Sequence, residues 1–354
     1  LCHDGVDRTA ELLPWHGDAD VTRLSPVDAS ARYLAHLRAA WDHAHPDDPL
    51  DQQDVVITLP ASFDEVAREL TVAAAQKAGL PRVYLIEEPQ AAFYAWIESQ
   101  KELWRQKVRV GEQILVCDAG GGTTDFSLIQ VTEEKGELAL RRAAVGEHLL
   151  LGGDNMDLAL AYAIQAKLAA KKQKLDAWQF RGLWHSCRTA KENLFGRPGP
   201  KSKIPPEPVV VLGRGSSLIG GTLRTELTRA ECESILLDGF FPVCGAGDRP
   251  EEKPRVGMRE MGLPYVADPA ITRHLARFLD RQTGEQGDAS GAFPTAVLFN
   301  GGVMKSQVIR ERLLEVLRTW REGDAPLREL PSTDLDLAVA RGAATYGLAR
   351  RGRG

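Results

Sequence analysis

The chain has 354 residues, 43% of them hydrophobic and 26% charged, and a formal net charge of −5. This length exceeds the usual size of one compact core, so at least two lobes are expected. The slightly acidic charge argues against nucleic acid as a partner, and the absence of any apolar run of roughly 18 residues argues against a membrane span. Five scattered cysteines favour reduced thiols and a cytoplasmic location over a disulfide framework.

The first element expected is a helix over residues 26–42, which starts from Ser25 and Pro26. Apolar residues recur along it at helical spacing. The pattern predicts that its buried side consists of Tyr33, Leu34, Leu37 and Trp41.

From residue 55 onward the pattern becomes α/β. The continuous apolar run 55–59 predicts a buried strand that Pro60 ends. Ser62 and Glu65 form a capping-box pattern that predicts the start of a helix, and Gly79 is expected to stop it. Four residues are expected to face inward from this helix: Val66, Leu70, Ala73 and Ala74.

A second strand is expected at 83–86, followed by a helix at 89–99 in which Pro89 is the first residue. After a polar stretch, three further strands form a meander whose first connection is rich in glycine. The strands are expected at 113–117, 126–131 and about 138–145, and a helix opened by Asp154 and Asn155 at 154–171.

Residues 176–240 have the pattern of a separate lobe. It is expected to contain a helix at 178–195, a strand at 208–212, a further strand that includes 217–219, and a helix at 228–238. Residues 242–266 are rich in glycine, proline and charge and are expected to be loop. The remaining elements are expected at 269–282 (helix), 296–299 (strand), 306–320 (helix) and 334–350 (helix).

The segment Asp118–Asp125 carries the strongest chemical signal. Three glycines, Gly120, Gly121 and Gly122, allow backbone N–H groups to approach an anion without interference from Cβ atoms. The two bordering carboxylates and the hydroxyl of Thr123 suit a hydrated magnesium ion. A plain flexible hairpin is the alternative interpretation of the same glycine run.

Two other segments carry weaker signals. Glu87 and Glu88 follow a strand and begin a helix, where a carboxylate could orient a metal-bound water or simply favour the helix N-terminus. Phe299–Val303 is a strand–Gly-Gly–helix junction of the kind that lets a nucleotide lie against a helix N-terminus. A plain tight turn explains that junction equally well.

Together these segments resemble the nucleotide-binding domain of the heat-shock-protein-70 chaperones. The resemblance covers roughly residues 25–240 and 268–348. It rests on Ile57–Phe63, Ala78–Leu80, Glu88–Ala92, Asp118–Asp125, Leu151–Asn155, Cys187–Leu194, Phe299–Gly302 and Asp336–Ala344.

The resemblance implies an actin-like ATPase fold, with duplicated ribonuclease-H-like lobes around a nucleotide cleft. The implied layout is 1–105 as the remainder of lobe I, 106–175 as the base of lobe II, 176–245 as its upper subdomain, 246–268 as a loop insertion, and 269–350 as the base continued with the final helix.

The same resemblance implies ATP or ADP with Mg²⁺ as cofactors. Asp118 and Glu88 would hold magnesium through water, Thr123 would contact the γ-phosphate, and Asp125 would position or deprotonate the attacking water. The implied nucleotide contacts are Gly120, Gly121, Gly122, Thr124, Gly152, Gly153, Lys191, Gly301, Gly302, Lys305 and Asp336. Unfolded clients and co-chaperones would bind through parts of the parent protein outside this chain.

Some positions depart from the family pattern. Glu192 and Phe195 stand where the family usually has Arg and Ser next to adenine, and Lys305 stands in place of an Arg. The family also begins with a strand–Asp-Leu-Gly-Thr-Thr hairpin and a later catalytic Lys, neither of which precedes Lys77 here. We therefore expect the parent protein to be an ATPase and this chain as given to hydrolyse ATP poorly or not at all.

Two alternatives remain at this stage. A sugar or acid kinase of the same actin-like fold would also use a glycine-rich phosphate loop and a carboxylate base. A non-catalytic scaffold would keep the fold but not the turnover, as the altered adenine pocket suggests.

Overall fold

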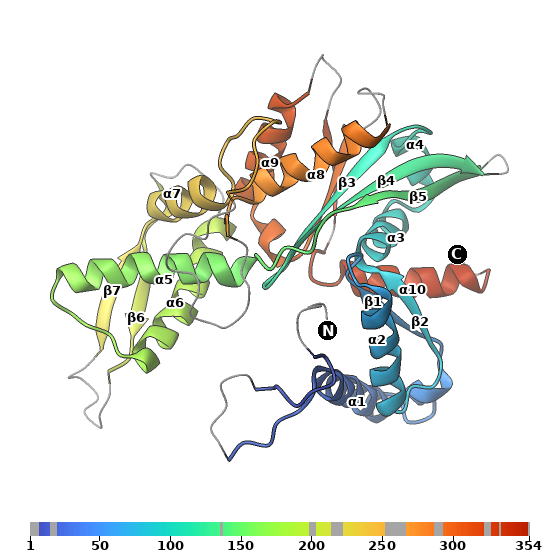
Figure 1. The fold of residues 1–354 in the computed structure, drawn as a ribbon, viewed down its shortest axis with the longest axis horizontal. Helices are drawn as coiled ribbons and strands as arrows, with labels where there is room; N and C mark the ends of the chain where they lie inside the picture. The colour runs from blue at the N-terminus through green and yellow to red at the C-terminus, as the bar shows by residue number, and fades with distance from the viewer. Residues whose placement is uncertain are drawn as a thin grey trace. The chain divides into compact units, whose positions relative to one another are not determined.

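The computed structural model describes residues 7–14, 20–134, 137–197, 203–213, 222–251, 267–286, 293–321, 327–332 and 334–352. Figure 1 shows its helices and strands along the chain. The chain divides into two compact units, one formed by Leu1–Trp104 with Leu337–Gly354 and the other by Arg105–Asp336.

The first unit contains a pair of parallel strands with helices packed on them. Strands β1 (Val55–Leu59) and β2 (Val83–Glu87) pair from Val55↔Val83 to Leu59↔Glu87. Its helices are α1 (Pro26–Ala44), η1 (Leu50–Gln52), α2 (Glu65–Lys77), α3 (Glu88–Gln100), η2 (Lys101–Leu103) and α10 (Ala338–Arg350). Both predicted strands are therefore confirmed.

The buried side of α1 differs from the predicted one. Val27 and Ala31 are buried and pack with Ala74 of α2, whereas Tyr33 and Leu37 are 76% and 60% exposed. Tyr33 lies two residues beyond Ala31, about 200° around the helix. The helix therefore meets α2 through its small residues and through Leu34, which packs against the same cluster as predicted. Tyr33, Leu37 and Trp41 face outward, contrary to the prediction.

The start of α2 also differs in detail. Asp64, not Ser62, is the N-cap: its Oδ1 accepts a hydrogen bond from the Ala67 amide at 2.6 Å. The same carboxylate forms an ion pair with Arg8 at 2.8 Å. Val66 is exposed, contrary to the prediction. Gly79 has a φ of +78°, just past the end of α2, and stops the helix as predicted.

Helix α10 packs along α3 and contacts β1. A Cβ atom on Gly342 would lie 1.6 Å from the carbonyl oxygen of Ala91, so only glycine allows this separation of the two backbones. The predicted layout placed 269–350 with the base of lobe II. In the structure, α10 belongs instead to the first unit, because its partner is α3.

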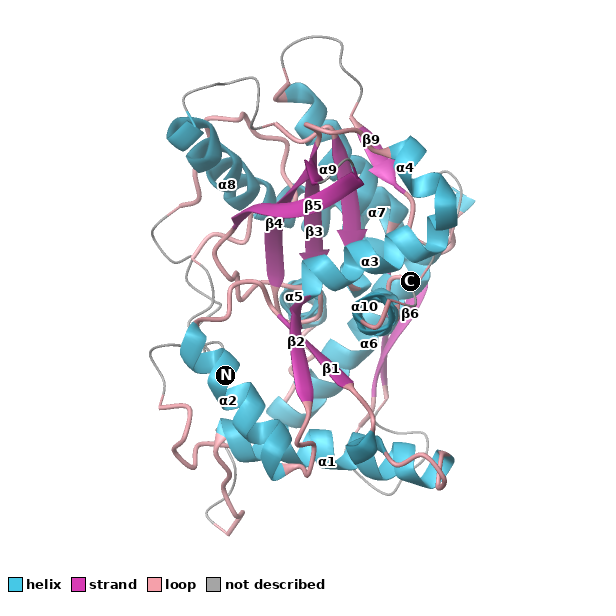
Figure 2. Ribbon diagram, turned by 90° about the vertical axis from the view of Figure 1, so that its right-hand side faces the viewer, coloured by secondary structure: helices cyan, strands magenta, loops and turns pink. Residues whose placement is uncertain are grey.

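The second unit is built on a five-stranded sheet in the order β5-β4-β3-β8-β9. Figure 2 shows its strands in magenta. The strands are β3 (Gln113–Ala119), β4 (Thr124–Glu134), β5 (Glu137–Val145), β8 (Ala296–Asn300) and β9 (Arg328–Leu330). The predicted meander is confirmed by the antiparallel pairs β3–β4 and β4–β5, and β8 pairs parallel to β3. Strand β9 was not predicted.

The other elements of this unit pack into one large apolar core. They are α5 (Gly153–Ala170), α6 (Ala177–Gly196), β6 (Glu207–Val211), β7 (Leu223–Leu227), α7 (Arg229–Phe240), α8 (Ile271–Gln286), η4 (Gly302–Lys305) and α9 (Gln307–Thr319). Helix α4 (Trp104–Lys107) spans the unit boundary. The strand expected at 217–219 and most of the loop expected at 242–266 lie outside the described residues.

The cysteines Cys117, Cys187, Cys232 and Cys244 are free thiols. Among the helices that the structure describes, none is both long and apolar enough to cross a membrane.

Candidate nucleotide-binding site

The glycine-rich connection between β3 and β4 is a tight turn. The amide of Gly120 donates to the carbonyl of Thr123 at 2.9 Å and closes the turn, while Gly121 and Gly122 are exposed at its tip. β3 is buried along its length except at Asp118, which is half-buried. The turn therefore extends from a rigid, buried strand.

The N-terminus of α5 is anchored on this turn. The amide of Gly153 donates to the carbonyl of Gly120 at 3.0 Å, and that of Asp154 donates to the carbonyl of Gly121 at 2.7 Å. A Cβ atom on Gly152 would lie 2.6 Å from the carbonyl oxygen of Gly121, so this contact requires glycine. The helix N-cap is thus Gly152 rather than the predicted Asp154 or Asn155.

Asp118 lies at the end of β3, where its carboxylate is largely removed from water. Its Oδ2 accepts a hydrogen bond from Nδ2 of Asn300, which ends the neighbouring parallel strand β8, at 2.6 Å. Burial raises the pKa of Asp118 to about 6, the nearby charge of Asp125 adds to the increase, and the Asn300 amide opposes it.

Asp125 is the direct cross-strand partner of Asp118 in the β3–β4 pair. Its Oδ1 lies 2.9 Å from Nδ1 of His148, in the loop that leads from β5 to α5, and both side chains are mostly buried. Two carboxylates therefore face each other across the hairpin, and each has a polar side chain from another segment beside it.

Thr123 and Thr124 occupy different environments. Thr123 is half-buried in the turn. Thr124 is fully buried, and its hydroxyl donates to the carbonyl of Leu151 at 2.7 Å. The side chain of Thr124 thus fastens the turn to the segment before α5, and its contact with a nucleotide stays a prediction.

The junction after β8 requires glycine for a similar reason. Gly301 has a φ of +85°, and a Cβ atom there would lie 2.3 Å from the carbonyl oxygen of Ala119 and 2.7 Å from Oδ1 of Asp118. The Gly-Gly segment therefore passes directly over the end of β3, close to the Asp118 carboxylate.

A cavity of about 480 Å³ lies beside these turns. Its volume is within the usual range for small-molecule sites. Its walls come from the glycine turn, the start of α5, the inner side of α6, and the segment from η4 into α9. Its lining residues from the predicted set are Gly120, Gly121, Gly153, Lys191, Gly302, Lys305 and Asp336.

The basic side chains of this cavity are ion-paired. Asp157 is 1% exposed and pairs with Lys191 at 2.7 Å and with Nε of Arg188 at 2.9 Å. Arg188 also contacts Asp154, and Lys305 pairs with Asp336.

A comparison with known protein families explains this arrangement of strands and glycine turns. The model of the family described as Hsp70 protein matches residues 14–238. That match covers more than half of the chain. The chain belongs to the Hsp70 family.

Individual relatives agree with this result. The chain is 30% identical over 323 residues to a chaperone protein HscA homolog of Bordetella pertussis, covering 91% of this chain and 41% of the relative. It is 33% identical over 173 residues to the HscA homolog of Acinetobacter baylyi and 37% identical over 171 residues to that of Cupriavidus necator, covering 49% and 48% of this chain and 26% and 25% of the relatives. The chain thus spans between a quarter and two fifths of the length of these relatives.

Membership in the Hsp70 family confirms the predicted resemblance and the actin-like α/β fold, and it implies nucleotide binding. The match favours an Hsp70-type domain over the metabolite kinase that the sequence left open.

The structure brings most of the predicted site residues of the second unit into one region, but not all into one cavity. Asp118 lies near the end of β3, Asp125 near the start of β4, and Gly301 directly after β8. None of the three lines the cavity. Glu88 belongs to the first unit, where it is the first residue of α3. Its neighbour Glu87 is buried and pairs with Arg68 at 2.8 Å.

Sequence reasoning missed four polar residues of this region: Asn300, His148, Asp157 and Arg188. Asn300 was visible as the last residue before Gly301-Gly302. His148 carried no signal, because it precedes the glycine pair in an apolar stretch and its partner Asp125 is distant in sequence.

Proposed function

We propose that this chain forms the ATP-binding and ATP-hydrolysing part of an Hsp70-type chaperone that acts as a nucleotide-driven conformational switch. The observation that carries the proposal is the glycine turn Gly120–Gly122, fastened to the N-terminus of α5 at the edge of a 480 Å³ cavity. Family membership supports the nucleotide as ligand, and the carboxylate pair Asp118 and Asp125 supports hydrolysis.

The residues present fit a nucleotide with magnesium. Glycine at positions 152 and 301 permits the close backbone contacts that hold the glycine turns together beside the cavity. The carboxylates of Asp118 and Asp125 are oxygen donors of the type that magnesium prefers, and Asp118 is poorly hydrated. We propose that Asp118 holds magnesium through water. The same role for Glu88, which belongs to the first unit, stays a prediction from the resemblance to the Hsp70 family.

The contribution of magnesium, when bound, is positive charge that offsets the charge of the phosphates. In the rest of the proposal, residues of the chain position the phosphates and the attacking water. Thr123 contacts the γ-phosphate, Asp125 accepts a hydrogen bond from the attacking water, and the backbone around Gly120 and Gly153 lies along the phosphates and ribose. Lys191, Gly302, Lys305 and Asp336 line the nucleotide cavity.

For the full-length protein we propose unfolded polypeptides as clients, co-chaperones as regulatory partners, and a cytoplasmic location. In this proposal nucleotide binding shifts the balance between conformations of the two units. Only a nucleotide with different affinity for those conformations can shift their populations.

Calorimetric titration of ATP and ADP with Mg²⁺ into the full-length protein tests this proposal. We expect binding, and slow hydrolysis that Asp118→Asn reduces by at least about 100-fold without loss of fold. A folded wild-type protein that binds no nucleotide at millimolar concentration contradicts the proposal.

A second candidate is a scaffold that binds partners without turnover. It is favoured by the cavity cations Arg188, Lys191 and Lys305, each of which is already neutralised by an acidic neighbour. In that case Asp118→Ala in the full-length protein leaves partner binding unchanged whether or not ATP is present. A partner affinity that depends on ATP and on Asp118 excludes the scaffold.

A further inference from the structure

We propose that His148 is a positioning residue for ATP hydrolysis, whose imidazole fixes the orientation of the Asp125 carboxylate. The inference rests on the proposed function. Its central observation is the 2.9 Å contact between Nδ1 of His148 and Oδ1 of Asp125. Both side chains are mostly buried, with 15% and 11% of their surface exposed, so competition from bulk water is weak.

The chemistry of this contact determines which ring nitrogen of His148 carries the proton. An ionised carboxylate only accepts hydrogen bonds, so Nδ1 of His148 must carry the proton when Asp125 is ionised. The two carboxylates of the hairpin then have separate donors, Asn300 for Asp118 and His148 for Asp125. Each donor offsets part of the repulsion between two negative charges held on paired strands.

The loop that carries His148 is fastened to β4 on both sides. Gly146 donates its amide to the carbonyl of Phe126 at 2.8 Å, and Thr124 and Leu149 exchange backbone hydrogen bonds at 3.0 and 3.3 Å. On β4 the bonded residues lie on either side of Asp125, and on the loop they lie on either side of His148. The imidazole is therefore held against one carboxylate by the backbone.

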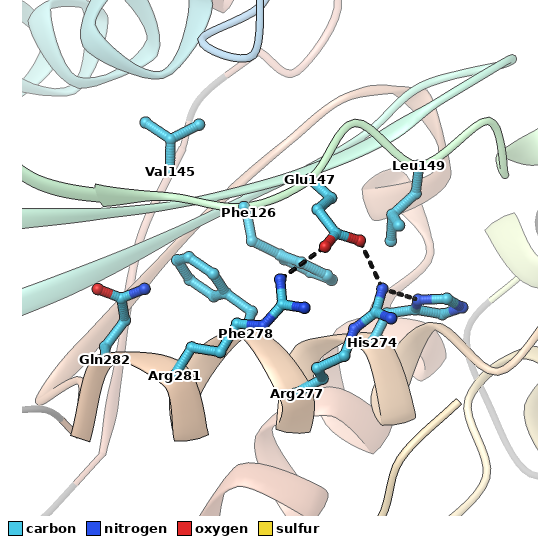
Figure 3. Close-up of a pocket in the computed structure, with 10 residues that line it drawn as sticks. Phe126, Val145, Glu147, Leu149, His274, Arg277, Phe278, Arg281 and Gln282 are labelled. Carbon is cyan, nitrogen blue, oxygen red and sulfur yellow. Dashed lines mark hydrogen bonds and ion pairs between the residues drawn. The ribbon is translucent and has the colours of Figure 1, made fainter. Parts of the chain in front are cut away.

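Helix α8 holds the same loop from another side. Glu147, the residue before His148, pairs with Arg277 at 2.7 Å and with Arg281 at 2.6 Å. Figure 3 shows its carboxylate between the two guanidinium groups, above the rings of Phe126 and Phe278, which stack with centroids 6.0 Å apart. This double ion pair restricts the loop at the residue next to His148.

The expected effect of His148 is on the reaction rather than on binding. During hydrolysis the oxygen of water bonds to the γ-phosphorus as the bond from phosphorus to the bridging oxygen of ADP breaks. ADP leaves with the electron pair of that bond, and the water gives up one proton as inorganic phosphate forms. His148 forms no bond with any of these atoms. It limits the orientations of Asp125, and misplacement of a group that orients the water lowers the rate of that step.

The test uses the full-length protein and three substitutions that separate the two ring nitrogens. Asn places an amide N–H near the position of Nδ1, whereas Gln places one near that of Nε2. We expect His148→Ala and His148→Gln to lower the single-turnover rate by on the order of 10- to 100-fold, with ATP affinity within about twofold of wild type. His148→Asn should recover most of the rate.

The matched control is His36→Ala, which removes an exposed histidine from α1 in the first unit and should leave rate and affinity unchanged. Melting temperatures are measured for all variants. A wild-type rate in His148→Ala overturns the inference, as does an equal loss in all three variants that follows their melting temperatures. A wild-type protein that is folded but neither binds nor hydrolyses ATP overturns the proposed function itself, and this inference with it.

Discussion

At the scale of single residues, the region of the β3–β4 turn combines desolvation with charge. Asp118 and Asp125 face each other on paired strands, and Asn300 and His148 reach them from β8 and from the loop before α5. Two ionised carboxylates in this position lower the stability of the folded protein, because burial and a like charge both disfavour ionisation. Costly groups of this kind are characteristic of functional sites.

The first prediction concerns the loss of folding stability that the ionised, buried carboxylate of Asp118 causes. Its pKa is raised from 3.8 to about 6, so between those values the folded protein holds a proton that the unfolded chain releases. The contribution of Asp118 to stability therefore falls as pH rises from about 4 to about 6 and is level above that range. At pH 7.5, Asp118→Asn should stabilise the protein by on the order of 2 to 3 kcal/mol.

Thermal unfolding at several pH values checks this prediction. The melting temperature of the Asp118→Asn variant should exceed that of wild type by several degrees at pH 7.5, and the difference should shrink toward pH 4. A difference that does not change with pH contradicts the assignment of the cost to Asp118. Asn300→Ala is the companion variant, because it removes the neighbouring donor and should raise the pKa of Asp118 further.

The second prediction concerns Glu192, an exposed acid that lines the cavity. Its negative charge opposes the binding of a polyphosphate. Glu192→Gln should tighten ATP binding by roughly 2- to 5-fold at low salt, with a smaller gain at 0.5 M salt because exposed charges are screened. Isothermal titration at both salt concentrations measures the effect, and Glu226→Gln, which changes an exposed acid on β7, is the control. Equal affinities of Glu192→Gln and wild type at low salt contradict it.

At the scale of elements, the sequence predicted where strands and turns lie along the chain better than it predicted which side chains are in contact. The strand at 55–59 and the glycine turn at 120–122 were correct, because apolar runs and glycines act locally. The outward orientation of Tyr33 was not predictable from its own helix, since it depends on the small residues with which α1 meets α2. The contact between Asp125 and His148 joins residues 23 apart in sequence, so no periodic pattern indicates it.

The third prediction concerns the packing of α10 against α3. A methyl group at position 342 would overlap the backbone of Ala91, so Gly342→Ala must push the two helices apart. We expect a loss of at least about 2 kcal/mol in the unfolding free energy of the first unit. Denaturant titration followed by a probe in the first unit measures it.

The control for this change is Gly182→Ala in α6. A Cβ atom at position 182 meets nothing within 4 Å, and the residue is exposed within a helix. Alanine should therefore stabilise the protein by about 0.5 to 1 kcal/mol through its higher helix propensity. Similar effects of the two substitutions would contradict the packing argument.

At the scale of the whole molecule, the two units differ in whether they are formed from one continuous segment of the chain or from two. The second unit is continuous from Arg105 to Asp336, whereas the first is completed by a segment that follows it, Leu337–Gly354. The contact between α10 and α3 therefore joins residues 88–100 to residues 338–350, and the first unit depends on segments far apart in sequence.

The fourth prediction follows from this discontinuity. Removal of α10 should expose the side of α3 that carries Ala91, because Ala343 of α10 packs with it in one apolar cluster. Backbone amides of α3 and β1 should then exchange with deuterium at least about 10-fold faster, while those of β3 and β4 keep their protection. Mass-spectrometric exchange measures both sets in one experiment.

Arg351→Ala provides the comparison, since it removes only an exposed ion pair with Asp54. Such pairs contribute little, so exchange should stay close to that of the intact chain. Equal acceleration in both units after removal of α10 would mean that the units do not unfold separately.

The late position of α10 also has a consequence during synthesis on the ribosome. After α3 has left the exit tunnel, the whole of Arg105–Asp336 must be translated before Gly342 can meet Ala91. At about 5 to 20 residues per second this takes on the order of 10 to 50 seconds. For that interval the side of α3 that carries Ala91 lacks the helix that covers it in the finished protein.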